Sequence, residues 1–284
     1  METLYYSRPE IKITASGVSI KINNDSFVIQ QFDKIKDIVI IAKSGYISVY
    51  ALKLLALKNV SLTLNNMNGE LIYNIIPQYP NKNLDNRILQ YQQYLQNRKK
   101  VSDLIVKTKK LKYEKLLEKL GLPSLTSNEE SVYSNEYWAY IGRLFNEYGY
   151  NYYSRKGFYA VNNQKAINPI NSILNFYYGI VEHRLLNDFA YYGLDFNISF
   201  LHIPQYNKLP LTYDVIEFLR SDIDKIVLQL AKEKRIKQTD FKLTEKGFYL
   251  LKEEKIKKYL QEIEPIENKT RETVETFIDL LASV

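Results

Sequence analysis

The sequence has no cysteine among its 284 residues and only two histidines, His183 and His202. Without cysteine, the chain cannot form disulfide bonds, thiolate nucleophiles, iron–sulfur clusters or cysteine-ligated zinc sites. Any metal ion must therefore be held by oxygen ligands and imidazole. That ligand set favours hard divalent ions such as Mg²⁺ or Mn²⁺.

Long apolar runs are also missing. No stretch approaches the about 20 apolar residues that cross a bilayer. The opening residues, METLYYSRPEIKI, have neither the basic region nor the apolar region of a signal peptide. We therefore expect a cytoplasmic protein that does not contact a membrane. The 45% hydrophobic content is that of a globular protein with a real core.

The sequence has fewer acidic than basic residues, with 32 Asp and Glu against 39 Lys and Arg. Its formal net charge is therefore +7 at pH 7. An excess of this size favours a polyanionic partner such as nucleic acid, although basic enzymes with small substrates are also common. The chain also has 25 tyrosines. Tyrosine rings can stack on bases, but filling half-buried helix faces is their commoner role.

Residues 1–76 have the pattern of a β-rich domain. The runs KITASGVSIKI, SFVIQQF and DIVIIA are short stretches of Ile, Val and Phe bounded by Gly, Asn, Asp and Ser, as half-buried strands are. An amphipathic helix is expected at residues 48–59, and Asn68-Gly69 predicts a hairpin turn within 60–76. The segment PQYPNKN at 77–83, with two prolines, is the predicted linker.

From residue 84 the apolar period becomes helical. One long helix or two should end at Gly121, and another should begin with a capping box from Ser127 to Glu130. Residues 168–193 predict a helix with Asn168 as N-cap and Pro169 at its first position, and 212–230 predict a further helix. The predicted class is α+β: a small N-terminal β-rich domain, then a larger all-α C-terminal domain at 84–284.

Three residues that could bind a metal ion lie close together in the sequence, between positions 202 and 217. Asp214 and Glu217 are three apart on the expected helix and therefore share a face, while His202 comes from the preceding loop. One imidazole and two carboxylates suit a divalent ion. Spacing alone leaves an alternative open, because acids are favoured near helix starts and loop histidines are commonly surface residues.

The other histidine, His183, stands between Glu182 and Arg184, which is typical of a solvated helix face and argues against catalysis. A basic run on the first long helix is either a solvated face or a phosphate-binding surface. The candidate DNA-binding residues are Arg98, Lys99, Lys100, Lys107, Lys109, Lys110, Lys112 and, further along, Arg220.

Several motifs occur in an order that resembles one known family. GLDFNISFLH followed by YDVIEFLR is similar to the GLdP-x-iGflH and yDLmEpfRp signatures of the CRISPR-associated spacer-acquisition integrases, the first universal family of CRISPR-associated proteins. NPINSILNFYYGIVEHRLL resembles the family's DPvNalLnygYaiL helix, NEYWAYIG its first acidic motif, ExxA, and GYISVYALKLLALKNVSLTLNNMNGELI its β domain. The ordered set is more specific than any single motif.

This resemblance implies a metal site. Glu136, His202 and Glu217 take the places of the family's metal ligands, and Asp214 matches the aspartate beside the last of them. The catalytic residues implied are therefore Glu136, His202, Glu217 and Asp214, with Mg²⁺ or Mn²⁺ as cofactor. Ser199, Asn168 and Ser221 depart from the family pattern without removing a ligand.

The resemblance also implies a metal-dependent DNA integrase and endonuclease that inserts short duplexes into a repeat array. Its implied partners are duplex and branched DNA, a second copy bound through the β-rich domain, and a small ferredoxin-like CRISPR-associated protein that bridges two dimers. Two alternatives are a structure-specific metal nuclease outside CRISPR and a non-catalytic DNA-binding scaffold.

Overall fold

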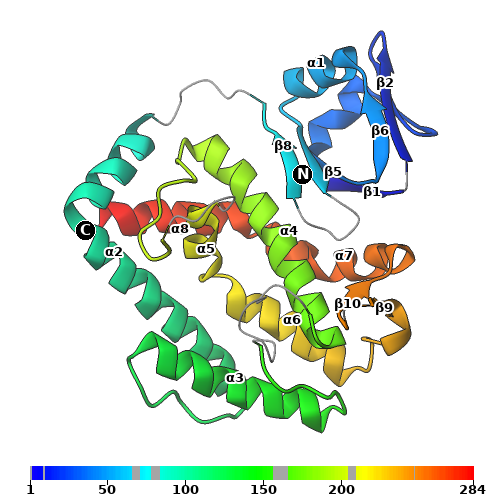
Figure 1. The fold of residues 1–284 in the computed structure, drawn as a ribbon. Coiled ribbons are helices and arrows are strands. Elements are labelled where there is room, and N and C mark those ends of the chain that lie inside the picture. The colour runs from blue at the N-terminus through cyan, green and yellow to red at the C-terminus, as the bar shows by residue number, and fades with distance from the viewer. Residues whose placement is uncertain are drawn as a thin grey trace. The chain divides into compact units, whose positions relative to one another are not determined.

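The computed structural model describes residues 2–8, 10–65, 71–77, 84–155, 166–203, 209–245 and 247–284. The chain divides into two compact units, Met1–Asn83 and Leu84–Val284. The first is rich in strands and the second is mainly helical (Figure 1). This arrangement confirms the predicted α+β class.

The N-terminal unit contains two four-stranded sheets. Its elements are β1 (Glu2–Ser7), β2 (Glu10–Ser16), β3 (Ser19–Ile22), β4 (Asp25–Val28), η1 (Ile29–Lys34), β5 (Ile35–Ile41), β6 (Ser44–Ile47), α1 (Val49–Leu57), β7 (Ser61–Asn65) and β8 (Leu71–Ile75). One sheet has the order β1-β5-β7-β8 and the other β4-β3-β2-β6. In the first, β5 lies parallel to both β1 and β7, and β8 is antiparallel to β7.

Alternating apolar residues build the core of this unit. On β2, Ile11 and Ile13 are buried while their neighbours face outward, and on β5 Ile38 and Ile40 join the same core around Phe32. The strand expected at 26–32 ends at Val28, where the chain turns into η1. The antiparallel pair β7–β8 confirms the hairpin, although Asn68-Gly69 itself lies outside the described residues, as do residues 78–83 of the expected linker.

The C-terminal unit consists of α2 (Leu84–Lys119), α3 (Glu130–Glu147), α4 (Pro169–Tyr192), α5 (Pro210–Ile216), α6 (Arg220–Lys232), η3 (Gln238–Asp240), β9 (Phe241–Leu243), β10 (Tyr249–Leu251), α7 (Glu253–Glu267) and α8 (Thr270–Ala282). The antiparallel pair β9–β10 was not predicted from the sequence. None of the described helices is long and apolar enough to cross a membrane.

The α4 helix lies at the centre of this unit and packs against α5, α6, α7 and α8 (Figure 1). It begins as predicted, because the Asn168 side chain accepts a hydrogen bond from the Asn171 amide and Pro169 is the first helical residue. It ends at Gly193, which has a φ of 76°. Residues of α4 are buried on most sides of the helix, so α4 serves as the scaffold for its neighbours.

Three local predictions were wrong. The α3 helix begins at Glu130 with Glu129 as N-cap, so the Ser127–Glu130 capping box does not form. The single helix expected at 212–230 is interrupted, because α5 ends at Ile216 and α6 begins at Arg220. His183 is buried rather than solvated. Burial lowers its pKa to about 4, and the charge of Arg184 contributes in the same direction.

Candidate functional site

His202 is held in place by Asp214, which lies on α5 and is fully buried. The Asp214 carboxylate accepts hydrogen bonds from the main-chain nitrogens of Phe200 (2.6 Å), Leu201 (3.1 Å) and His202 (3.0 Å). The same carboxylate lies 2.8 Å from His202 Nδ1. This contact orients the ring and leaves Nε2 as the nitrogen able to bind an ion.

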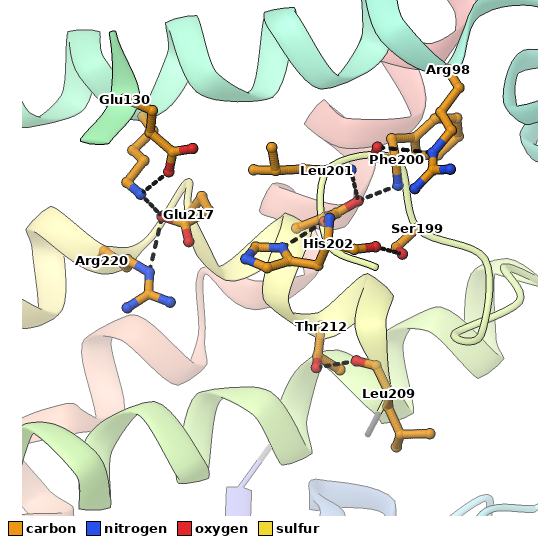
Figure 2. Close-up of polar contacts among 12 residues, drawn as sticks. Arg98, Glu130, Ser199, Phe200, Leu201, His202, Leu209, Thr212, Glu217 and Arg220 are labelled. Carbon is orange, nitrogen blue, oxygen red and sulfur yellow. Dashed lines mark hydrogen bonds and ion pairs between the residues drawn. The ribbon is translucent and has the colours of Figure 1, made fainter. Parts of the chain in front are cut away.

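The α2 helix holds the same segment from another side. Arg98 Nε donates to the Phe200 carbonyl at 3.2 Å, and Gln90 Nε2 donates to the Ile198 carbonyl at 2.9 Å. The Ser199 hydroxyl closes the turn by donating to the His202 carbonyl (Figure 2). The approach to His202 is therefore a fixed turn, even though the histidine side chain itself is 37% exposed.

Glu217 lies in the break between α5 and α6, and it is buried. Its Oε2 is 2.9 Å from Arg220 Nε and 3.1 Å from Lys109 Nζ. Burial would raise the pKa of this carboxyl, but the charges of Arg220, Lys109 and His202 together hold it below its ordinary value.

The structure brings a different glutamate of α3 to this site than the sequence predicted. Glu130 Oε1 lies 2.6 Å from the same Lys109 Nζ that contacts Glu217, and Figure 2 shows the chain of contacts that links Glu130, Glu217 and Arg220. Glu130 lies on the face of α3 that carries the buried Tyr133 and Tyr137. The sequence signal that could have identified Glu130 is its spacing from Tyr133 and Tyr137, because steps of three to four residues place all three on one face of the helix.

Glu136 points elsewhere on α3. Its carboxylate accepts hydrogen bonds from the Thr126 amide at 2.8 Å and from the Thr126 hydroxyl. These bonds with Thr126 lower the pKa of Glu136. Within the part of the chain that the structure describes, no contact joins Glu136 to His202 or Glu217. The grouping of Glu136 with those residues therefore stays a prediction that the described contacts do not support.

A buried network underlies the site, and no sequence motif indicated it. Asp224 on α6 accepts hydrogen bonds from the hydroxyls of Tyr137 (2.7 Å) and Tyr178 (2.6 Å). The Arg220 guanidinium lies 4.9 Å from the centre of the Tyr178 ring. Burial raises the pKa of Asp224 to about 6, although both tyrosine hydrogen bonds oppose the rise. The network fixes the position of Arg220 and, through it, that of Glu217.

The candidate DNA-binding residues fall into two groups. Lys99, Lys100 and Lys107 are exposed, and Lys110 and Lys112 are partly exposed. The prediction was wrong for Lys109, which is buried between Glu130 and Glu217 rather than solvated. Arg98 and Arg220 are directed at the Phe200 carbonyl and at Glu217. The lysines that are exposed or partly exposed are therefore the candidates accessible to a phosphate backbone.

The donor types at the site suit a divalent ion, since they comprise one imidazole and carboxylates from two separate segments. Their arrangement does not close around one. In the described residues, no three His, Asp or Glu side chains form a group that could hold a metal ion. Between Glu130 and Glu217, the Lys109 ammonium contacts both carboxylates.

Comparisons with known proteins agree with this fold. The family described as "CRISPR associated protein Cas1" matches residues 4–131 and 123–265. A relative from Methanobrevibacter ruminantium, "CRISPR-associated protein Cas1 3", is 27% identical over 247 residues, which is 73% of this chain and 70% of the relative.

Solved structures share the fold. The structure titled "Casposase bound to integration product" superposes with a TM-score of 0.81 at 20% identity and covers 100% of this chain and 92% of its own. The structure titled "Cas6-RT-Cas1--Cas2 complex" superposes with a TM-score of 0.72 at 13% identity and covers 99% of this chain and 35% of its own.

Proposed function

The chain belongs to the CRISPR-associated Cas1 family, and from this premise we propose that it is a DNA integrase and endonuclease of CRISPR adaptation. In this role it would insert short DNA duplexes, the new spacers, into the repeat array. The proposal is supported by the likeness to a casposase that is bound to an integration product. It is also supported by a site in which carboxylate donors contact the cations Lys109 and Arg220 and an imidazole is held by Asp214.

The reaction proposed is an in-line phosphoryl transfer. The 3′-hydroxyl oxygen of the incoming duplex forms a bond to a phosphorus of the repeat, and the bond from that phosphorus to the repeat's own 3′-oxygen breaks. The proton lost by the attacking hydroxyl is balanced by the one that the leaving oxygen gains. With water as the nucleophile, the same displacement is endonucleolytic cleavage.

We further propose that the activity depends on Mg²⁺ or Mn²⁺, with His202, Glu217 and Glu130 as the residues that would hold the ion. A bound ion polarises a nonbridging phosphate oxygen and stabilises charge on the attacking or leaving oxygen. Asp214 orients His202 from behind through Nδ1. Glu136, which the family motif suggested, keeps its contacts with Thr126 and is replaced in this role by Glu130.

Exposed lysines of α2 provide the proposed DNA contact. Lys99, Lys100 and Lys107 are exposed along the helix that also carries Lys109 into the site. Affinity of this kind comes from releasing counterions from phosphates and does not depend on sequence. A duplex held along α2 would therefore approach the residues that perform the chemistry.

The proposed partners follow from the same family. A second copy would bind through the β-rich unit, residues 1–76, and a small ferredoxin-like CRISPR-associated protein would bridge two dimers. The solved complex that contains Cas1 and Cas2 supports such a partner. Residues 84–284 would form the catalytic domain, and we place the protein in the cytoplasm.

The observation that carries the proposal is the contact of one Lys109 ammonium with Glu130 of α3 and with Glu217 in the break between α5 and α6, together with the hold of Asp214 on His202. The test is a strand-transfer assay with a labelled short duplex and a supercoiled plasmid that contains a repeat array. With the small partner protein and Mn²⁺, we expect the label to become joined to plasmid at the repeat, and we expect EDTA to prevent joining.

Two alternative functions give different results in that assay. A structure-specific nuclease outside CRISPR would cut branched DNA without joining any ends. A non-catalytic scaffold would bind duplex with full affinity and form no product with either ion. Either result would replace the proposal.

A further inference from the structure

Lys109 lies between two candidate ligands of the site. It reaches the site from α2, and its side chain is only 9% exposed. Its Nζ is 2.6 Å from Glu130 Oε1 on α3 and 3.1 Å from Glu217 Oε2 in the break between α5 and α6. One ammonium therefore joins three separate segments of the helical unit.

The surroundings hold this ammonium in place. Its charge lies 5.9 Å from the centre of the Tyr113 ring, which is itself buried and stacked on Tyr137 at 3.7 Å. A buried lysine is stable only when its charge is paired, and here both partners are carboxylates. The ammonium in turn pairs with both acids, and Glu217 has a second cation beside it, Arg220.

We propose that Lys109 is a built-in cation that holds Glu130 and Glu217 together in the metal-free protein, and that a divalent ion must displace its Nζ from both carboxylates in order to bind. This inference rests on the proposed metal dependence of the same site. It accounts for the absence of a three-donor group among the described residues, because the ammonium occupies the place between two of the donors. Lys109 is thus a positioning residue that competes with the ion.

The test compares Lys109→Met with the wild type. Methionine keeps an unbranched apolar side chain and removes the charge. Mn²⁺ binding is measured by isothermal titration calorimetry, and the unfolding temperature is measured in EDTA and in Mn²⁺. Lys115→Met, at an exposed position on the same helix, is the matched control and should behave as the wild type in both measurements.

Without the ammonium, two carboxylates face each other, so Lys109→Met should have a lower unfolding temperature than the wild type in EDTA. Mn²⁺ no longer has to displace a charged group, so its affinity should rise by about 10-fold or more, which corresponds to about 1.4 kcal/mol. The rise in unfolding temperature on adding Mn²⁺ should be larger in the variant than in the wild type.

A second variant keeps the test decisive if Lys109→Met does not fold in EDTA. Adding Glu130→Gln removes one of the two facing charges, so the double variant should recover folding and should not show the increased Mn²⁺ affinity. A double variant that remains unfolded would overturn the inference, because the defect would then not be repulsion between the carboxylates.

The remaining outcomes separate this inference from the proposed function. If the wild type binds Mn²⁺ and Lys109→Met binds it equally or more weakly, Lys109 does not compete with the ion and the inference fails alone. If neither protein binds Mn²⁺ or Mg²⁺, the metal site itself is wrong, and both proposals fail together.

Discussion

Asp214 Oδ1 lies 2.8 Å from His202 Nδ1 and 3.0 Å from the main-chain nitrogen of the same residue. One carboxylate oxygen therefore fixes both the ring and the backbone of His202, while the other oxygen accepts from the amides of Phe200 and Leu201. Asp214 is fully buried and cannot be solvated in exchange. Asp214 therefore positions His202, and in the proposed metal site it would not itself bind the ion.

Replacing Asp214 by Asn should weaken strand transfer without abolishing it. The amide keeps one acceptor oxygen, so the turn at His202 is loosened, and the loss of an orienting partner typically costs about 10- to 100-fold. Excess Mn²⁺ should restore part of the rate, whereas Glu217→Gln should stay inactive at every Mn²⁺ concentration. The measurement is the strand-transfer rate across a Mn²⁺ titration, and rescue of Glu217→Gln but not Asp214→Asn would reverse the two roles.

Glu130 and Glu136, both on α3, are the two candidates for the third metal ligand and can be compared directly. Glu130→Gln should abolish strand transfer, since Glu130 reaches the cation that contacts Glu217. Glu136→Gln should stay within about 3-fold of the wild type, because its carboxylate contacts Thr126 near the surface, and surface changes generally have small effects. Single-turnover rates with matched protein and Mn²⁺ decide between them, and inactivity of Glu136→Gln alone would restore the assignment made from the family motif.

The buried His183 makes stability depend on pH. Burial lowers the pKa of His183 to about 4 from 6.5, so the folded state favours the neutral ring. The stability that His183 contributes is fully present above pH 6.5 and is lost as the pH falls towards 4. His183→Gln should therefore lose less free energy of unfolding across this interval, by about 3 kcal/mol at most. Urea unfolding of both proteins at about pH 7 and about pH 4.5 measures the difference, and parallel losses would contradict it.

The exposed lysines of α2 should contribute to DNA affinity through charge alone. Replacing Lys100 and Lys107 by Ala should weaken duplex binding for every sequence and reduce the slope of log affinity against log salt by about 0.9 for each phosphate that is no longer neutralised. Lys257→Ala, at an exposed position on α7, is the control and should leave the slope unchanged. Fluorescence anisotropy between low and moderate salt gives the slopes. If the Lys100 and Lys107 variant keeps the wild-type slope, this face of α2 is merely solvated.

Local signals in the sequence were sufficient for some elements of the fold. The ends of α4 follow from the side chain of Asn168, the fixed φ of Pro169 and the positive φ of Gly193, all of which act within one turn of the helix. The core of the N-terminal unit follows in the same way from the alternation on β2.

Long-range pairing explains what the sequence could not predict. His183 has charged neighbours in sequence, yet Arg184 is buried because it pairs with Glu267, 83 residues further along the chain. The break between α5 and α6 contains neither Gly nor Pro, and Glu217 within it is buried against Lys109 and Arg220. The choice between Glu130 and Glu136 likewise depends on Lys109 from another helix, which no local motif of α3 reveals.

DNA strand transfer at the site of His202 is best tested by comparing His202→Ala with the wild type. Both proteins are incubated with the short duplex, the repeat plasmid, the partner protein and Mn²⁺, and duplex affinity is measured in parallel. We predict that His202→Ala binds duplex with nearly the wild-type affinity, since lysines provide most of it, and joins no detectable ends. Joining by His202→Ala at the wild-type rate would contradict the proposal that this site performs strand transfer.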